Sequence, residues 1–134
     1  MIKFFLFVLF LITSILFADN NYETALYEKI FPLLMDKKII KIYTRNENKP
    51  VFKKSKDMVL VNDCINADIV FGAFYDAKCA KKPHFATTYK DFIKDKSAIG
   101  AFYWKKGRPQ LRFSRKAFEK FHLILPKILE KYAQ

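Results

Sequence analysis

Glycine is scarce in this chain, with three among 134 residues, and its placement excludes some familiar functions. Neither a Walker-type nor a dinucleotide-type glycine spacing occurs, so a nucleotide-binding fold is disfavoured. No internal repeat is visible, which argues against a repeat architecture. The chain is 51% apolar and 17% aromatic, and a disordered tail lacks such side chains. The length predicts a single folded domain.

Histidine is also scarce, and the two that occur, His84 and His122, lie in no recognised catalytic arrangement. The HExxH, GxSxG and CxxCH motifs are absent. We therefore predict a protein that is not an enzyme and has no catalytic residues, metal or cofactor. The alternative is an enzyme whose acid pair assembles only in space and leaves no mark in the sequence. We expect His122 to face the core from a helix and His84, next to Pro83, to be exposed.

Cysteine occurs twice, at positions 64 and 79, without a CxxC motif. A disulfide between Cys64 and Cys79 would close a short loop and stabilise the domain by about 3 kcal/mol in the chain-entropy model. A metal site would need more ligands than His84 supplies, and redox-active pairs usually form a CxxC motif. Redox chemistry, metal binding and free thiols are the alternatives to this structural disulfide.

The chain begins with the pattern of a secretory signal peptide. Met1-Ile2-Lys3 is a short positive start, Phe4–Phe17 is an apolar run, and Ala18 is a small residue at the expected cleavage point. The run of about 14 residues is shorter than the roughly 20 that span a membrane. We expect residues 1–18 to be removed and Asp19–Gln134 to form a periplasmic domain, where disulfides persist. An uncleaved anchor is the alternative, because Leu16 is unusual at the third position before the cut.

Acidic residues are few, 13 against 25 lysines and arginines, which gives a net charge of +12. The electrostatic field of this positive charge attracts phosphorylated ligands, lipid headgroups or an acidic protein. Nucleic acid would fit the charge, but the expected export argues against it. The basic residues form three clusters: Lys53-Lys54-Lys56, Lys81-Lys82, and Lys105-Lys106-Arg108 with Arg112, Arg115 and Lys116. The alternative is an ordinary lysine-rich surface.

The apolar pattern predicts strands mixed with helices. The first helix carries Tyr22, Ala25, Leu26, Ile30, Leu33 and Leu34 on one face, and Pro32 predicts a kink or an early end near Ile30–Phe31. Further helices are expected over 52–57, 89–94, 114–121 and 126–132. Strands are expected over 39–43, 58–61, 67–72, 84–87, 98–104 and 110–113, the last two joined as a β-hairpin. The sequence thus predicts an α/β domain, or an α+β one, with a mixed sheet flanked by helices.

Three segments resemble a known family. They are Ala67-Asp68-Ile69-Val70-Phe71-Gly72, Phe85-Ala86-Thr87-Thr88-Tyr89, and the stretch from Ala98 to Gln110 that contains Phe102-Tyr103-Trp104-Lys105-Lys106-Gly107-Arg108-Pro109. Together with Leu123-Ile124-Leu125-Pro126 they look like small exported bacterial domains of the YfiR-like kind, which resemble one lobe of a periplasmic solute-binding protein. The resemblance implies a periplasmic domain that senses a ligand or binds a partner, sometimes controlling an inner-membrane signalling protein. The chain departs from YfiR in having only two cysteines.

Two segments are candidates for a binding site. Thr87, Thr88 and Tyr89 combine hydroxyls with a helix start, where free backbone N–H groups can hold an anion; simple capping by Thr88 is the alternative. The hairpin brings Lys105, Lys106, Arg108 and Arg112 close to Tyr103 and Trp104. We predict that these two segments bind a small anionic ligand or a periplasmic or inner-membrane protein. The alternative is a basic protein that interacts with an anionic membrane surface, or with another protein, without a ligand pocket.

Overall fold

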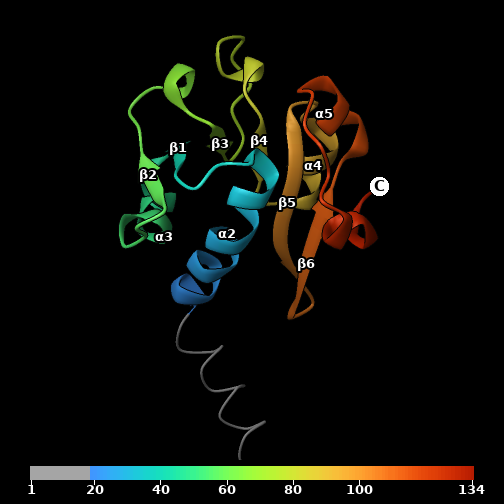
Figure 1. The fold of residues 1–134 in the computed structure, drawn as a ribbon. Helices are drawn as coiled ribbons and strands as arrows, with labels where there is room; N and C mark the ends of the chain where they lie inside the picture. The colour runs from blue at the N-terminus through green and yellow to red at the C-terminus, as the bar shows by residue number, and fades with distance from the viewer. Residues whose placement is uncertain (1–18) are drawn as a thin grey trace, which may run out of the picture.

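The structure, a computed structural model, describes the backbone from Asp19 and the side chains from Tyr22 to Gln134. The predicted signal peptide, residues 1–18, lies outside the described residues. A six-stranded sheet forms the centre of the molecule, with helices on both of its faces (Figure 1). The predicted α/β fold with a mixed sheet is confirmed. In the described part of the chain, no helix is both long and apolar enough to cross a membrane.

The elements follow one another in a largely alternating order. The strands are β1 (Ile40–Thr44), β2 (Met58–Leu60), β3 (Ile69–Phe71), β4 (His84–Ala86), β5 (Ala98–Lys105) and β6 (Arg108–Phe113). The α-helices are α2 (Asp19–Met35), α3 (Lys49–Lys53), α4 (Tyr89–Lys94) and α5 (Arg115–Lys120). Short 3-10 helices are η1 (Asn46–Asn48), η2 (Cys64–Asn66), η3 (Cys79–Lys81) and η4 (Lys127–Tyr132).

The strands lie in the order β2-β1-β3-β4-β5-β6. The first five are parallel, and β6 pairs antiparallel with β5 through the hairpin. Because the chain leaves β1 toward β2 on one side and later reaches β3 on the other, the strand order reverses between β1 and β3. The carboxyl ends of the parallel strands share one edge of the sheet, where open α/β sheets usually bind ligands.

Alternating side chains divide the sheet into two faces. Ile42, Phe71 and Phe85 are buried on the face that α2 covers, where they join one large core with Phe31 and Phe52. On the opposite face, Val70 packs in a smaller cluster with Cys64 and Cys79. Ala86 and Ala101 pack beneath Phe92 of α4 on that same opposite face. The period-two alternation of the strands therefore accounts for a two-sided core.

Helix α2 differs from its prediction in two respects. It continues through Pro32 to Met35 rather than ending near Ile30. Tyr27, Phe31 and Leu34 are buried against the sheet, whereas Leu33, expected on the apolar face, is 53% exposed. The helix ends only at Asp36 (φ 52°), where the Lys37 N–H donates to the Pro32 carbonyl. Packing of Phe31 and Leu34 on the core outweighs the single hydrogen bond that Pro32 cannot donate.

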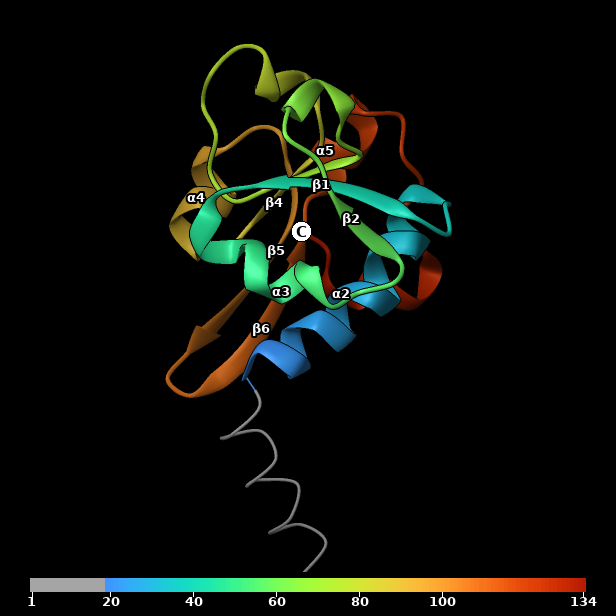
Figure 2. The same ribbon diagram turned by 90° about the vertical axis from the view of Figure 1, so that its left-hand side faces the viewer.

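The hairpin joins β5 to β6 through a two-residue turn. Lys106 (φ 50°) and Gly107 (φ 76°) are both left-handed, as a type I′ turn requires. Lys105 lies opposite Arg108, Trp104 opposite Pro109, and Ala101 opposite Arg112. The strands run beyond the rest of the sheet, so the turn projects from the molecule near the start of α2 (Figures 1 and 2).

Strand β5 passes close to the core rings at Gly100. A Cβ atom at this position would lie 2.8 Å from ring carbons of Phe85 and Phe113 and 3.0 Å from the Arg112 carbonyl oxygen. Only glycine allows the two rings to pack against the strand at this separation.

Candidate functional site

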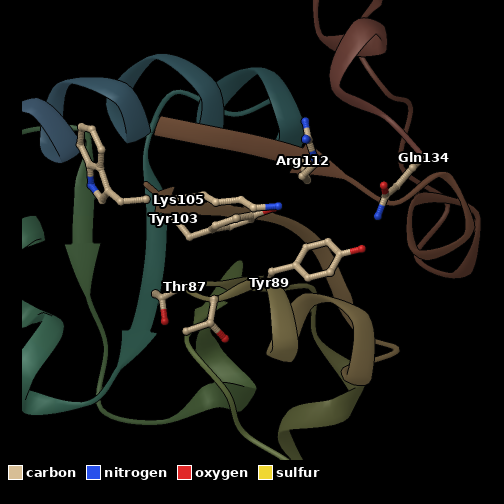
Figure 3. Close-up of a pocket in the computed structure, with 8 residues that line it drawn as sticks. Thr87, Tyr89, Tyr103, Lys105, Arg112 and Gln134 are labelled. Carbon is tan, nitrogen blue, oxygen red and sulfur yellow. The ribbon is translucent and has the colours of Figure 1, made fainter. Parts of the chain in front are cut away.

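The main candidate site is a cavity of about 520 Å³ between the start of α4 and the β5–β6 hairpin. It is lined by Thr87, Thr88, Tyr89, Tyr103, Trp104, Lys105, Arg112 and Gln134. Figure 3 shows Thr87 and Tyr89 on one side, facing Tyr103 and Lys105, with Arg112 and Gln134 toward one end. Hydroxyls, cations and aromatic rings therefore converge on one space.

The end of β4 positions the first wall. Thr87 and Thr88 follow directly after Ala86, the last residue of β4, so they lie at the carboxyl edge of the parallel strands. Thr88 caps α4: its hydroxyl accepts the Asp91 N–H at 3.1 Å and donates to Asp91 Oδ2 at 3.0 Å. The Thr88 hydroxyl thus serves the cap, as the alternative hypothesis held. The Thr87 hydroxyl has no hydrogen-bond partner within residues 22–134 and is free to meet a ligand.

The register of β5 and β6 positions the second wall. Because Ala101 lies opposite Arg112 and side chains alternate along a strand, Tyr103, Lys105 and Arg112 project from the same face of the hairpin. The ring of Tyr103 lies 5.8 Å from that of Tyr89 across the cavity, centroid to centroid. The two walls therefore meet through aromatic rings, with the cations beside them.

The cavity carries uncompensated positive charge. In the described part of the chain, no carboxylate lies within ion-pair distance of Lys105 or Arg112. Arg112 is half-buried, and its guanidinium donates to Gln110 Oε1 at 3.2 Å and to the Leu111 carbonyl at 3.4 Å. These neutral acceptors orient the guanidinium and leave its charge for an incoming anion.

The carboxylate that is hydrogen-bonded to Thr88 of the cavity wall, Asp91, is already engaged. Asp91 Oδ1 accepts the hydroxyl of Tyr75 at 2.9 Å, and its other oxygen accepts Thr88. Desolvation, and then the hydrogen bond to Asp91, raise the pKa of Tyr75. Through these two hydrogen bonds Asp91 connects Tyr75, in the segment between β3 and β4, to Thr88 at the start of α4.

Five of the seven predicted ligand-binding residues line the cavity: Thr87, Thr88, Tyr89, Lys105 and Arg112. Lys106 and Arg108 do not: Lys106 lies in the exposed turn of the hairpin, and Arg108 is the exposed first residue of β6. Tyr103, Trp104 and Gln134 complete the lining and were not among the predicted residues. Tyr103 could have been found, because it alternates with Lys105 along the strand. Gln134 could not have been found, because its position depends on the hydrogen bond from its backbone N–H to the carbonyl of Phe113, the last residue of β6.

A smaller cavity of about 430 Å³ lies at the carboxyl end of β1, lined by Arg45, Glu47, Asn62 and Phe74 among others. Here the Arg45 guanidinium donates to the Ala73 carbonyl at 2.6 Å and lies 4.1 Å from the ring centroid of Phe74. The positive charge of Arg45 is therefore engaged by the Ala73 carbonyl and the Phe74 ring, and the Glu47 carboxylate adds negative charge to the lining. This cavity suits an anion less well than the first.

Both histidine predictions are wrong. His84 is fully buried rather than exposed: its Nδ1 lies 2.6 Å from Asp95 Oδ2 and its Nε2 2.7 Å from the Cys79 carbonyl. His84 lies in β4, within the strand expected over 84–87, and its side chain is on the face that the disulfide segment covers. His122, expected in the core, is exposed after α5 with φ 55°. Neither imidazole reaches the main cavity.

The predicted disulfide between Cys64 and Cys79 is confirmed, with the two Cα atoms 5.4 Å apart. Both cysteines are buried, and their sulfurs lie near the carboxylate of Asp76. A disulfide sulfur is not the thiolate that binds metal ions, so this cluster holds no metal while the bond is intact. The bond fastens η2 to η3 over the face of the sheet opposite α2.

No family model matches the chain, and the comparison with curated proteins gave no match. A solved structure of a conserved domain protein from Vibrio cholerae O1 biovar eltor str. N16961 is similar in fold, with a TM-score of 0.51 and 12% sequence identity. The match covers 86% of this chain and 58% of that one, so this chain spans little more than half of its neighbour's length. The likeness supports the α/β fold and leaves the YfiR-like resemblance a prediction.

Proposed function

We propose that this chain is an exported binding domain that holds a small anionic ligand in the cavity between α4 and the β5–β6 hairpin, without catalysis. The observation that carries the proposal is the meeting of Lys105 and Arg112 with Tyr89 and Tyr103 around about 520 Å³ of space. The cavity lies at the carboxyl edge of the parallel strands, the edge at which α/β sheets bind small molecules, although the strand order reverses between β1 and β3 rather than at β4.

The lining defines the class of ligand. Lys105 and Arg112 fit a carboxylate or a phosphate, and Arg112 can offer two parallel N–H groups to either. Tyr89 and Tyr103 fit a flat apolar body beside that anionic group, whereas the Trp104 ring packs with Tyr22 and Phe102 on the other face of the hairpin. The ligand class is therefore a small anion with an aromatic or aliphatic ring, which Thr87 and Gln134 can orient by hydrogen bonds.

Export is the second part of the proposal. The amino-terminal pattern and the disulfide support a periplasmic location, and the absence of any recognised catalytic arrangement around the cavity favours sensing over chemistry. A periplasmic or inner-membrane protein is the partner that would receive the signal of a sensing domain.

The proposal is tested by native mass spectrometry of the protein isolated from its own cell envelope. We expect a bound small molecule on the wild-type chain and none on the Lys105→Ala/Arg112→Ala variant. The Lys106→Ala/Arg108→Ala variant is the matched control, because it removes the same charge from the same hairpin outside the cavity. A molecule that stays bound to the first variant, or a wild-type chain that carries none and gains no thermal stability from phenyl phosphate, overturns the assignment.

A further inference from the structure

The turn of the hairpin lies beside the first turn of α2. The ring of Tyr22 lies 6.1 Å from the ring of Trp104 and 6.1 Å from that of Phe102, centroid to centroid. Figures 1 and 2 both show the start of α2 and the end of the hairpin at the same end of the molecule. One extremity of the protein therefore combines two segments far apart in sequence.

We call residues Trp104–Arg108 the hairpin tip. Lys105, Lys106 and Arg108 are exposed there, and within residues 22–134 none of them forms an ion pair. Trp104, the one tryptophan of the chain, is a large apolar side chain that is 44% exposed. Lys106 and Arg108 serve neither the cavity nor the core, so burial and ligand binding leave their charges unexplained.

A tryptophan beside three cations on a protruding turn has the chemistry of a membrane-surface contact. Tryptophan prefers the headgroup region of a bilayer, and lysine and arginine near the surface are attracted to anionic lipids. The apolar run Phe4–Phe17 also ends shortly before Tyr22 in the sequence. Tyr22, which follows Phe17 by five residues in the sequence, is the residue of α2 whose ring lies beside that of Trp104 in the hairpin tip.

We propose that the hairpin tip docks on an anionic phospholipid bilayer, with Trp104 among the headgroups and Lys105, Lys106 and Arg108 on the lipid phosphates. The docking is independent of the ligand proposed above, because Lys106 and Arg108 lie outside the cavity. It places the mouth of the cavity close to the membrane surface, since Trp104 and Lys105 belong to both.

The single tryptophan supplies a local probe. The full-length protein, with its amino terminus identified by sequencing, is mixed with vesicles of phosphatidylcholine and phosphatidylglycerol whose acyl chains are brominated. We expect Trp104 fluorescence to shift to shorter wavelength and to be quenched. Vesicles of phosphatidylcholine alone should leave the emission unchanged, and high salt should reverse the quenching, because screening shortens the reach of exposed charges to about 3 Å at 1 M. This signal reports the hairpin tip even when another segment also binds the vesicle.

Charge reversal separates the hairpin tip from the net charge. Lys106→Glu/Arg108→Glu should weaken the vesicle affinity measured by quenching by roughly tenfold or more. The control Lys81→Glu/Lys96→Glu makes the same charge change at exposed positions in η3 and before β5, away from the turn, and should retain most of the affinity. Unquenched Trp104 in the wild type, quenching that survives in the tip variant, or equal loss in both variants would each overturn the proposal.

The outcome is separable from that of the ligand assignment. The tip variant should keep its bound small molecule in native mass spectrometry. Lys105→Ala/Arg112→Ala should lose that molecule yet still show quenching, because Trp104, Lys106 and Arg108 are intact. Failure of one proposal therefore leaves the other standing.

Discussion

His84 Nδ1 lies 2.6 Å from Asp95 Oδ2 in the buried space between β4 and the segment that follows α4. The other ring nitrogen faces the Cys79 carbonyl, so both nitrogens of this fully buried ring face acceptors. Asp95 also accepts the Ser97 N–H at 2.9 Å. This pair connects the disulfide segment, β4 and the start of β5 in one network.

We predict that Asp95→Ala destabilises the domain by roughly 1–3 kcal/mol, because the buried imidazole then lacks one partner. Asp95→Asn should cost less, since an amide oxygen still accepts a hydrogen bond. Urea denaturation followed by circular dichroism measures both. Asp76→Ala, at an exposed carboxylate nearby, is the control and should change little. Equal stability of the Asp95→Ala variant and the wild type would show that the pair contributes nothing net.

A second prediction concerns Gly100. The Gly100→Ala substitution forces a methyl group to within 2.8 Å of the Phe85 and Phe113 rings. We expect a loss of about 1–3 kcal/mol in unfolding free energy, the usual cost of overpacking a core. The same substitution in a Phe113→Leu background should cost less, because the smaller side chain makes room. A cost that is the same in both backgrounds would place the strain elsewhere.

The disulfide gives a third prediction. The oxidised chain should have the mass of the reduced chain less two hydrogens. Replacing Cys64 and Cys79 together by alanine should lower the unfolding free energy by about 3 kcal/mol, because the unfolded chain regains the entropy of the loop between them. Reduction of the wild type should lower the denaturation midpoint similarly, whereas the double variant should be insensitive to reductant. Free thiols in the protein isolated from its own cell would refute the pairing.

Asp63 supplies a prediction about acid stability. The backbone N–H of Ile65, and then the hydrogen bond and charge of Lys78, lower the pKa of the Asp63 carboxyl below its ordinary value. A lowered folded-state pKa means that this stabilisation is present above the unfolded-state pKa and is lost as pH falls through the folded-state value. The stability gap between wild type and Asp63→Ala should therefore be largest near neutral pH and should narrow in acid. Lys78→Ala should reproduce part of the gap, and a gap that does not change with pH would contradict the mechanism.

Local signals predicted α4 and failed at α3. Helix α4 spans Tyr89–Lys94 as predicted, because Thr88 and Asp91 form the cap that the sequence shows. The helix expected over 52–57 lies instead at Lys49–Lys53. Pro50 lies in the first turn of this helix, where proline is well suited. In α5 the Ser114 hydroxyl accepts the Ala117 N–H at 3.2 Å, as its cap position predicts.

The candidate site was predictable where it depends on strand alternation and unpredictable where it depends on tertiary contacts. Arg112 and Lys105 share a face because the hairpin register follows from its two-residue turn. Their meeting with Tyr89 depends on how β4 pairs with β5, which involves a register shift between His84 and Phe85. No sequence pattern marks such a shift. The burial of His84 likewise requires knowledge of which segment covers β4.

The position of Pro109 opposite Trp104 has a consequence for self-assembly. Lys105 and Arg108 flank the two-residue turn as a hydrogen-bonded pair, so the next pair, Trp104 and Pro109, has its backbone groups turned away from each other. The nitrogen of Pro109 therefore faces the open side of β6, where a strand from a second molecule would need an N–H donor. Further along β6, the Phe113 carbonyl already accepts the Gln134 N–H. The open edge of β6 is thus interrupted near both of its ends, which disfavours pairing of a second molecule's strand along this edge.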